Sequence, residues 1–172
     1  MRSFVIFAVV LALSRFSSAE AIVPAVLDSP ELVGSGAHRM MLMKIYEAEL
    51  YSNDGEFDIS RPFALKLIYA RKLNGDAIAD KSIELIRRQG IENEVQLAAW
   101  HELLNDIFPD VEKGTEIVGA HEAGVGAHFY VDGELVGLIE DPALCEKFFG
   151  IWFAEDTSAP RLRTNLLGLA AN

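Results

Sequence analysis

The apolar residues after residue 30 first follow the two-residue period of strands. Three segments are rich in strand-forming residues and partly alternate, which predicts strands at residues 32–40, 42–52 and 63–72. In the second segment, Tyr46, Ala48 and Leu50 share one face. In the third, Tyr69 and Arg71 share one face, so an arginine follows a tyrosine along an otherwise apolar surface.

Helical spacing replaces this alternation in the middle of the chain and returns at its end. It predicts four helices, at residues 76–90, 93–108, 141–153 and 160–168. Asp76 is a suitable N-cap for the first helix, and Gly90 ends it. Pro109 ends the second helix, and Pro142 and Pro160 open the last two.

Three further strands lie between the two pairs of helices. The pattern predicts them at residues 115–121, 125–131 and 134–139. Asp132-Gly133 is a tight hairpin signal, and Ser52-Asn53-Asp54-Gly55 predicts a turn earlier in the chain. Strands, helices, strands and helices in that order predict an α+β fold, with helices covering one face of a large antiparallel sheet. The length of 172 residues fits one domain.

The N-terminus has the pattern of a secretory signal peptide. A positive start at Arg2 precedes an apolar run over residues 4–13, and small residues follow it. The run is too short for a membrane span, which needs about 20 apolar residues. An uncleaved anchor or a buried helix is the alternative, and Arg15 argues against the anchor because it ends the run early.

This pattern predicts a signal peptide over residues 1–19, with cleavage after Ala19 or Ala21. The remaining domain would cover residues 22–172. We expect a bacterial protein that is periplasmic or secreted, without stable membrane insertion once the signal is removed.

Composition narrows the classes of partner and chemistry. The formal net charge of −11 argues against nucleic acids and against adsorption to anionic membrane surfaces. Cys145 is the single cysteine, so no internal disulfide can form, and its apolar neighbours predict a buried structural thiol. The four histidines lack the spacing of a helical zinc site, although His121 and His128 could meet across a hairpin. We predict no metal site and no cofactor.

Arginines are the candidate functional residues. Arg39 precedes the apolar run at residues 40–43, and an arginine in such a place needs an acceptor or solvent. Arg39, with Arg71 and the hydroxyls of Tyr46 and Tyr69, could bind a carboxylate or enolate that has an apolar tail. The alternative is that these arginines form structural salt bridges with some of the 26 acidic residues.

Motifs along nearly all of the domain resemble the bacterial chalcone isomerase-like family. The first half carries Gly34-x-Gly36-x-x-Arg39 and then Lys44-Ile45-Tyr46-x-Ala48-x-Leu50-Tyr51. The second half carries Phe129-x-x-Asp132-Gly133, Gly150-Ile151-Trp152-Phe153 and Leu162-x-x-x-Leu166-Leu167-Gly168. The resemblance implies an open-faced β-sandwich, in which a large antiparallel sheet lies under a layer of helices.

The resemblance also implies two kinds of site. In the plant enzymes that close a flavanone ring, an arginine of this region helps to hold and polarise the substrate, and Arg39 matches it. A threonine in the next strand assists there, and Tyr46 falls at the comparable place. The tyrosine and asparagine of the following helix are not evident here. Non-catalytic relatives bind fatty acids through an arginine and a tyrosine, for which Arg39 and Tyr46 are available.

Three hypotheses follow. The first is an exported, non-catalytic binder of a small apolar carboxylate such as a fatty acid, or of a polyphenol-like molecule, through Arg39, Tyr46, Tyr69 or Arg71. The second is a chalcone isomerase-type lyase, with Arg39 as electrophile and Tyr46 assisting. The third is a structural or partner-binding protein.

Overall fold

The structure is a computed structural model that describes residue 23 and residues 27–169. The predicted signal peptide at residues 1–19 and both predicted cleavage sites, after Ala19 and Ala21, lie outside the described residues.

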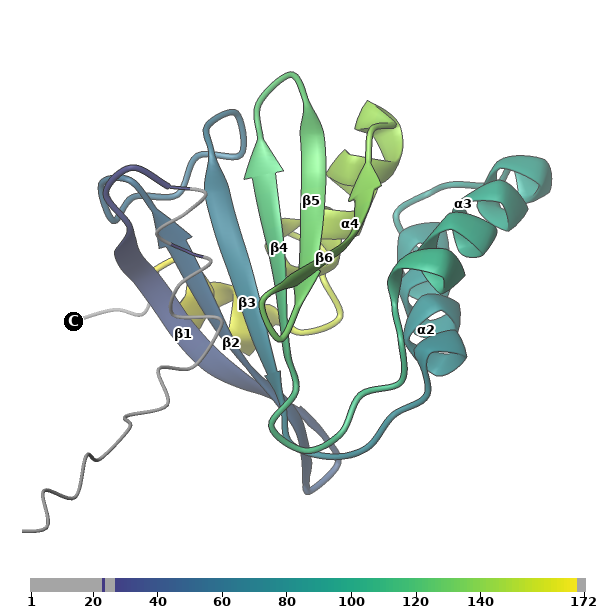
Figure 1. Cartoon of the computed structure of the whole chain (residues 1–172), viewed down its shortest axis with the longest axis horizontal. Helices are drawn as coiled ribbons and strands as arrows, with labels where there is room; N and C mark the ends of the chain where they lie inside the picture. Colours follow the sequence, from purple (N-terminus) through teal and green to yellow (C-terminus); the bar gives the residue numbers. More distant parts are fainter. Residues whose placement is uncertain (1–22, 24–26, 170–172) are drawn as a thin grey trace, which may run out of the picture.

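Six antiparallel strands form one sheet in which each strand pairs with its neighbours in sequence (Figure 1). The strands are β1 (Glu31–Met40), β2 (Met43–Ser52), β3 (Phe63–Tyr69), β4 (Glu116–Glu122), β5 (Gly126–Val131) and β6 (Glu134–Ile139). Every predicted strand is present, and the α+β fold with an antiparallel sheet is confirmed. The turn predicted at Asp132-Gly133 joins β5 to β6, with both residues at positive φ.

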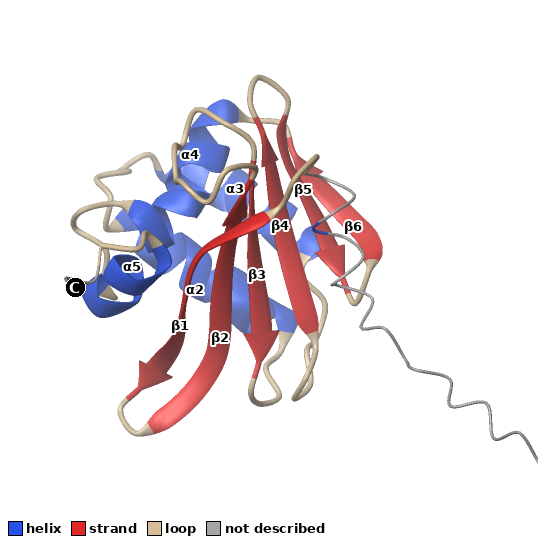
Figure 2. Cartoon of the chain, turned by 90° about the vertical axis from the view of Figure 1, so that its left-hand side faces the viewer, coloured by secondary structure: helices blue, strands red, loops and turns tan. Residues whose placement is uncertain are grey.

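Helices cover one face of this sheet, as Figure 2 shows, which also confirms the prediction. They are α2 (Gly75–Arg87), α3 (Glu94–Ile107), α4 (Pro142–Phe153) and α5 (Pro160–Leu166). α2 packs against α3 and α4, and α5 packs against β1. On the other face, Val23 and Leu27 pack against Ala64 and Val118. Among the described residues, no helix is long and apolar enough to cross a membrane.

Two glycines let α5 lie directly on the first strand. A Cβ atom at Gly34 would lie 2.1 Å from the backbone oxygen of Asn165, and one at Gly36 would lie 2.9 Å from a methyl carbon of Leu162. Real Cβ atoms do not approach other heavy atoms so closely. The Gly-x-Gly spacing therefore serves helix packing, and it marks positions 34 and 36 as facing the helix layer.

The third strand is shorter than predicted. It ends at Tyr69, and the predicted extension through residue 72 is wrong. The N–H of Ala70 donates to the carbonyl of Ile45, and the chain then turns so that Leu73 forms a bridge with Val111. Arg71 lies in this turn, so the expectation that it shares the Tyr69 face of a strand is wrong as well.

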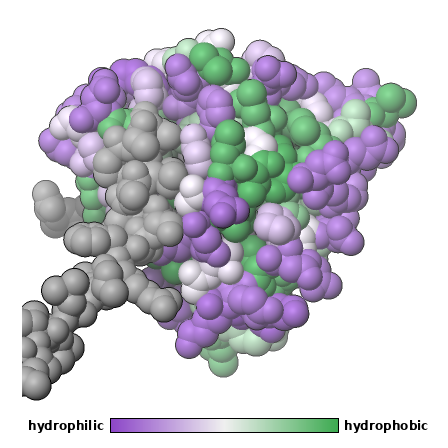
Figure 3. Space-filling model, viewed as in Figure 1, coloured by the Kyte–Doolittle hydropathy of each residue, from purple (hydrophilic) through white to green (hydrophobic). Residues whose placement is uncertain are grey.

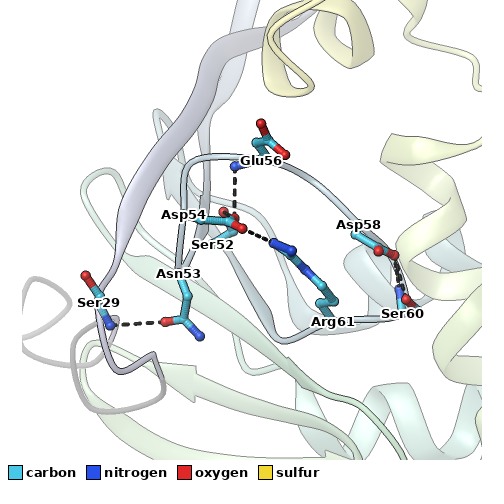
Figure 4. A network of polar contacts seen from close by, with 8 residues as sticks. All are labelled: Ser29, Ser52, Asn53, Asp54, Glu56, Asp58, Ser60 and Arg61. Carbon is cyan, nitrogen blue, oxygen red and sulfur yellow. Dashed lines mark hydrogen bonds and ion pairs between the residues drawn. The ribbon is translucent and has the colours of Figure 1, made fainter.

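Polar contacts order the loop between β2 and β3, where the sequence predicts a turn (Figure 4). Asp54 accepts hydrogen bonds from the N–H of Glu56 and from the Arg61 guanidinium. Asn53 accepts one from the N–H of Ser29, which ties the loop to the segment before β1. This loop follows the end of β2 that lies opposite the β1–β2 hairpin.

Candidate functional site

A cavity of about 300 Å³ lies between the inner face of the sheet and the helices α2 and α4. This volume is at the lower end of the range for small-molecule sites, roughly 300–1,000 Å³. Most of its wall is apolar, and four phenylalanines from α4, β5 and the end of α3 contribute to it: Phe108, Phe129, Phe148 and Phe149. Their rings contact one another at centroid distances of 5.2–5.8 Å.

The polar side chains of the cavity include a connected group on β1, β2, β3 and α4. The His38 ring stacks on Tyr46 at 5.0 Å, and Tyr46 meets Tyr69 edge to face at 5.9 Å. The indole N–H of Trp152 donates to the Tyr46 hydroxyl at 3.1 Å. The strand alternation of β2 and β3 aims both tyrosines at the helix layer, where Ala48 and Leu67 continue the same faces.

Two phenol protons in this group have no acceptor in the described part of the protein. The Tyr46 oxygen accepts from Trp152, so its own proton remains to be donated. The Tyr69 hydroxyl makes no hydrogen bond with any described residue, although Tyr69 is only 5 % exposed. The hydroxyl lines the cavity and is not fully buried, so an acceptor on a ligand in the cavity would receive its proton.

Burial keeps both phenols protonated. It raises the pKa of Tyr46 to about 12, against the opposing effect of the Trp152 hydrogen bond. It also raises the pKa of Tyr69, with the nearby Tyr46 adding to the shift. Near neutral pH the two groups are therefore hydrogen-bond donors and carry no charge.

Positive charge at the cavity comes from α2. Lys81 lines the cavity, and its Nζ also lies 2.7 Å from a carboxylate oxygen of Glu84. Burial, and secondly the charge of Lys81, lower the pKa of His38. His38 is therefore neutral near pH 7, and a bound anion would favour its protonated form.

The exposed members of the wall mark the mouth of the cavity. They are Met40 at the end of β1, Ala77 and Lys81 on α2, and Ser158 in the segment before α5. His38 is half-buried beside Met40 on the same strand face. The imidazole and the ammonium group thus belong to the entrance side, whereas the phenylalanines are buried.

Of the four residues singled out from the sequence, the structure brings two together. Tyr46 and Tyr69 line the cavity on neighbouring strands. Arg39 and Arg71 are exposed and are not part of the wall, so they do not join the two tyrosines at this cavity. A role for the two arginines in binding a ligand stays a prediction.

Arg39 lies outside the cavity wall because side chains alternate between the two faces of the sheet along β1. Gly34, Gly36, His38 and Met40 face the helices or the cavity, so Arg39 faces the opposite side. A register shift follows His38, where β2 has Ile45 as an extra residue, and both Ile45 and Tyr46 then line the cavity.

His38 and Lys81 were not predicted as site residues, although the sequence contains signals for both. Counting in twos from Gly34 reaches His38. Helical spacing from Ile78 reaches Lys81, Ser82 and Leu85, which all line the cavity.

Cys145 is buried on α4, as the sequence predicts. Burial, and secondly Asp141, raise the pKa of its thiol to about 11, so it is not a thiolate at neutral pH. Within the described part of the chain, no three His, Cys, Asp or Glu side chains are grouped so that they could hold a metal ion.

Comparisons with known proteins agree with this architecture. A family model described as chalcone isomerase-like matches residues 24–168. Among solved structures, a fatty-acid-binding protein of Arabidopsis thaliana matches with a TM-score of 0.63 and 16 % sequence identity. That match covers 83 % of this chain and 89 % of the plant protein. No curated protein sequence matches the chain.

Proposed function

The chain belongs to the chalcone isomerase-like family, and from this premise we propose that it binds an amphiphilic carboxylate, such as a fatty acid, in the cavity beneath α2 and α4. One observation carries the proposal: two phenol donors that have no acceptor among the described residues line an otherwise mostly apolar cavity. A carboxylate offers the acceptors that Tyr46 and Tyr69 lack in the described part of the chain. The aromatic part of the wall suits an apolar tail.

Charge favours an anion over a neutral head group. Lys81 stands at the mouth, and His38 can become protonated when an anion lies beside it. Hydrogen bonds to an ionised acceptor are roughly twice as strong as those between neutral groups. The similar fold of the plant fatty-acid-binding protein supports a ligand of this class, although its 16 % identity carries no residue roles across.

The groups that line the cavity favour ligand binding over chalcone-type ring closure. The phenols are held protonated, so neither is poised as a base near neutral pH. α2 contains no tyrosine and no asparagine, and it presents Lys81 and Ser82 to the cavity instead. We also propose that the protein is exported, on the pattern of residues 1–19.

Calorimetric titration tests the proposed function with a long-chain saturated carboxylate and with the alcohol of the same length. We expect one site per chain and tighter binding of the carboxylate. Absence of carboxylate binding would contradict the proposal, and so would equal affinity for both compounds.

A further inference from the structure

The tip of the β1–β2 hairpin, Met40–Met43, is the longest run of consecutive exposed large apolar residues in the described part of the chain. The exposed fractions are 55 % for Met40, 91 % for Met41, 94 % for Leu42 and 48 % for Met43. The other large exposed apolar residues occur singly in the sequence. Exposed apolar residues are ordinary when scattered, but a contiguous group marks an interaction surface.

The tip projects away from the rest of the sheet. In Figures 1 and 2 the hairpin extends beyond the ends of the neighbouring strands. Figure 3 shows hydrophobic atoms at this lower edge of the molecule, below a band of hydrophilic residues. A projecting apolar tip can insert into an apolar environment while the rest of the protein stays in water.

The turn itself departs from ordinary hairpin chemistry. A two-residue hairpin turn favours Asn and Gly because its central residues adopt positive φ. Here Met41 has a φ of 56°, so a large apolar side chain occupies a backbone conformation that suits Gly or Asn better. Departures of this kind are expected where function selects the side chain.

The charges around the tip are mostly positive. Arg39 and Lys44 are paired directly across the two strands, an arrangement that is destabilising for like charges. An Arg71 N–H donates to the Met43 sulfur at 3.3 Å, which places a third cation at the tip. Lys72 follows it in the chain and is paired with Glu112.

Two carboxylates lie among these groups, at Glu47 beside Lys44 and at Glu112 beside Lys72. Four cations and two anions leave a local positive excess, although the whole chain has a formal charge of −11. At physiological ionic strength charges are screened beyond about 8 Å. The charge next to the tip therefore governs attraction to a surface that the tip touches.

We propose that the hairpin tip docks the protein on anionic phospholipid bilayers, with Met41 and Leu42 entering the acyl region and the surrounding cations meeting the lipid phosphates. Membrane binding of this kind combines buried apolar area with attraction to anionic lipids. Unbranched methionine side chains adapt readily to an irregular apolar surface.

Docking at this place would also bring the cavity to the bilayer. Met40 belongs both to the exposed tip and to the cavity wall, and His38 and Ile45 continue that wall along the hairpin. A ligand with an apolar tail could thus pass between bilayer and cavity with little exposure to water. The docking itself does not depend on which ligand the cavity holds.

A fluorophore on the tip tests the proposal in the full chain. Cys145 is the single cysteine of the sequence and is buried, so a Leu42→Cys variant can carry an environment-sensitive label at one position. The control carries the same label through Ser60→Cys, in the β2–β3 loop at the opposite end of β2. Vesicles are phosphatidylcholine alone or phosphatidylcholine mixed with phosphatidylglycerol.

We expect a blue shift for the label at residue 42 with phosphatidylglycerol vesicles and none for the label at residue 60. Met41→Ser should weaken the response of the residue 42 label at least about tenfold in lipid concentration. Val95→Ser, which changes an exposed apolar residue on α3, should not. Arg71→Glu should weaken the response more than Arg88→Glu, which changes the net charge equally.

Three results would overturn the proposal. The first is no shift of the residue 42 label with anionic vesicles, and the second is an equal response of both labels. The third is a shift that depends on protein concentration without vesicles, which would assign the tip to self-association. Because these experiments use no cavity ligand, their failure leaves the proposed ligand binding untouched, and failure of ligand binding leaves docking untouched.

Discussion

The Tyr69 hydroxyl offers the cleanest perturbation of the proposed site. Tyr69→Phe removes one oxygen that has no hydrogen-bond partner among the described residues. The protein loses no internal hydrogen bond, so its free energy of unfolding should stay the same or rise slightly. The ring remains in place against Tyr46, and the volume of the cavity hardly changes.

The effect on ligand binding should be much larger. A hydrogen bond to a charged group contributes about 1.5–3 kcal/mol, whereas one between neutral groups contributes about 0.5–1.5 kcal/mol. Tyr69→Phe should therefore raise the Kd of a long-chain carboxylate about 10- to 150-fold. The loss for the matching alcohol should be clearly smaller.

Calorimetric titration measures both affinities, and urea unfolding measures stability on the same samples. Arg39→Ala serves as the comparison, because Arg39 lies outside the cavity wall and should change carboxylate affinity less than about threefold. Equal losses for carboxylate and alcohol in Tyr69→Phe would refute the reasoning. A large loss of carboxylate affinity for Arg39→Ala, with none for Tyr69→Phe, would show that Arg39 binds the carboxylate, as the sequence suggested.

Three further predictions concern Tyr46, His38 and Gly34. Tyr46→Phe should destabilise the protein by about 1–3 kcal/mol in urea unfolding, because it leaves the indole N–H of the buried Trp152 unpaired; an unchanged midpoint would contradict the hydrogen bond. Carboxylate affinity should increase as the pH falls from neutral toward the lowered pKa of His38, because the bound anion raises that pKa and binding then takes up a proton. The increase should stop where the ligand itself becomes protonated, and His38→Gln should remove it; a pH response retained in that variant would assign the proton elsewhere. Gly34→Ala should cost about 1–3 kcal/mol because its Cβ would collide with the α5 backbone, and stability equal to that of the unmodified chain would show that α5 does not pack there.

The sequence predicted the fold well because each element carries its own local signal. Strand and helix periods, the prolines that open α4 and α5, and the Asp132-Gly133 turn are all readable over short windows. The β1–β2 turn was harder to define, because Met41 and Leu42 continue an apolar run and carry no turn residue. The end of β3 was missed because it depends on the distant bridge between Leu73 and Val111.

The site was only half predictable for a related reason. Tyr46 and Tyr69 were found because strand alternation places them on the inner face. Arg39 was favoured for its chemistry, although the alternation from Gly34 and Gly36 assigns the inner position to His38. Lys81 and Trp152 come from helices whose rotation over the sheet is set by tertiary packing, which no local pattern specifies.

Access to the cavity distinguishes a ligand site from a packing defect. Ala77 is exposed at the mouth on α2, so Ala77→Trp should obstruct the entrance without disturbing the core. Ala99 is exposed on α3 away from the cavity, and Ala99→Trp is the matched control.

Native mass spectrometry of the chain, mixed with equal amounts of a long-chain carboxylate and the matching alcohol, tests the central claim most directly. We predict one adduct per chain, formed mainly with the carboxylate, lost in Ala77→Trp and kept in Ala99→Trp. No adduct in the unmodified chain, or an adduct equally abundant in both variants, would contradict the claim that this cavity binds an amphiphilic carboxylate.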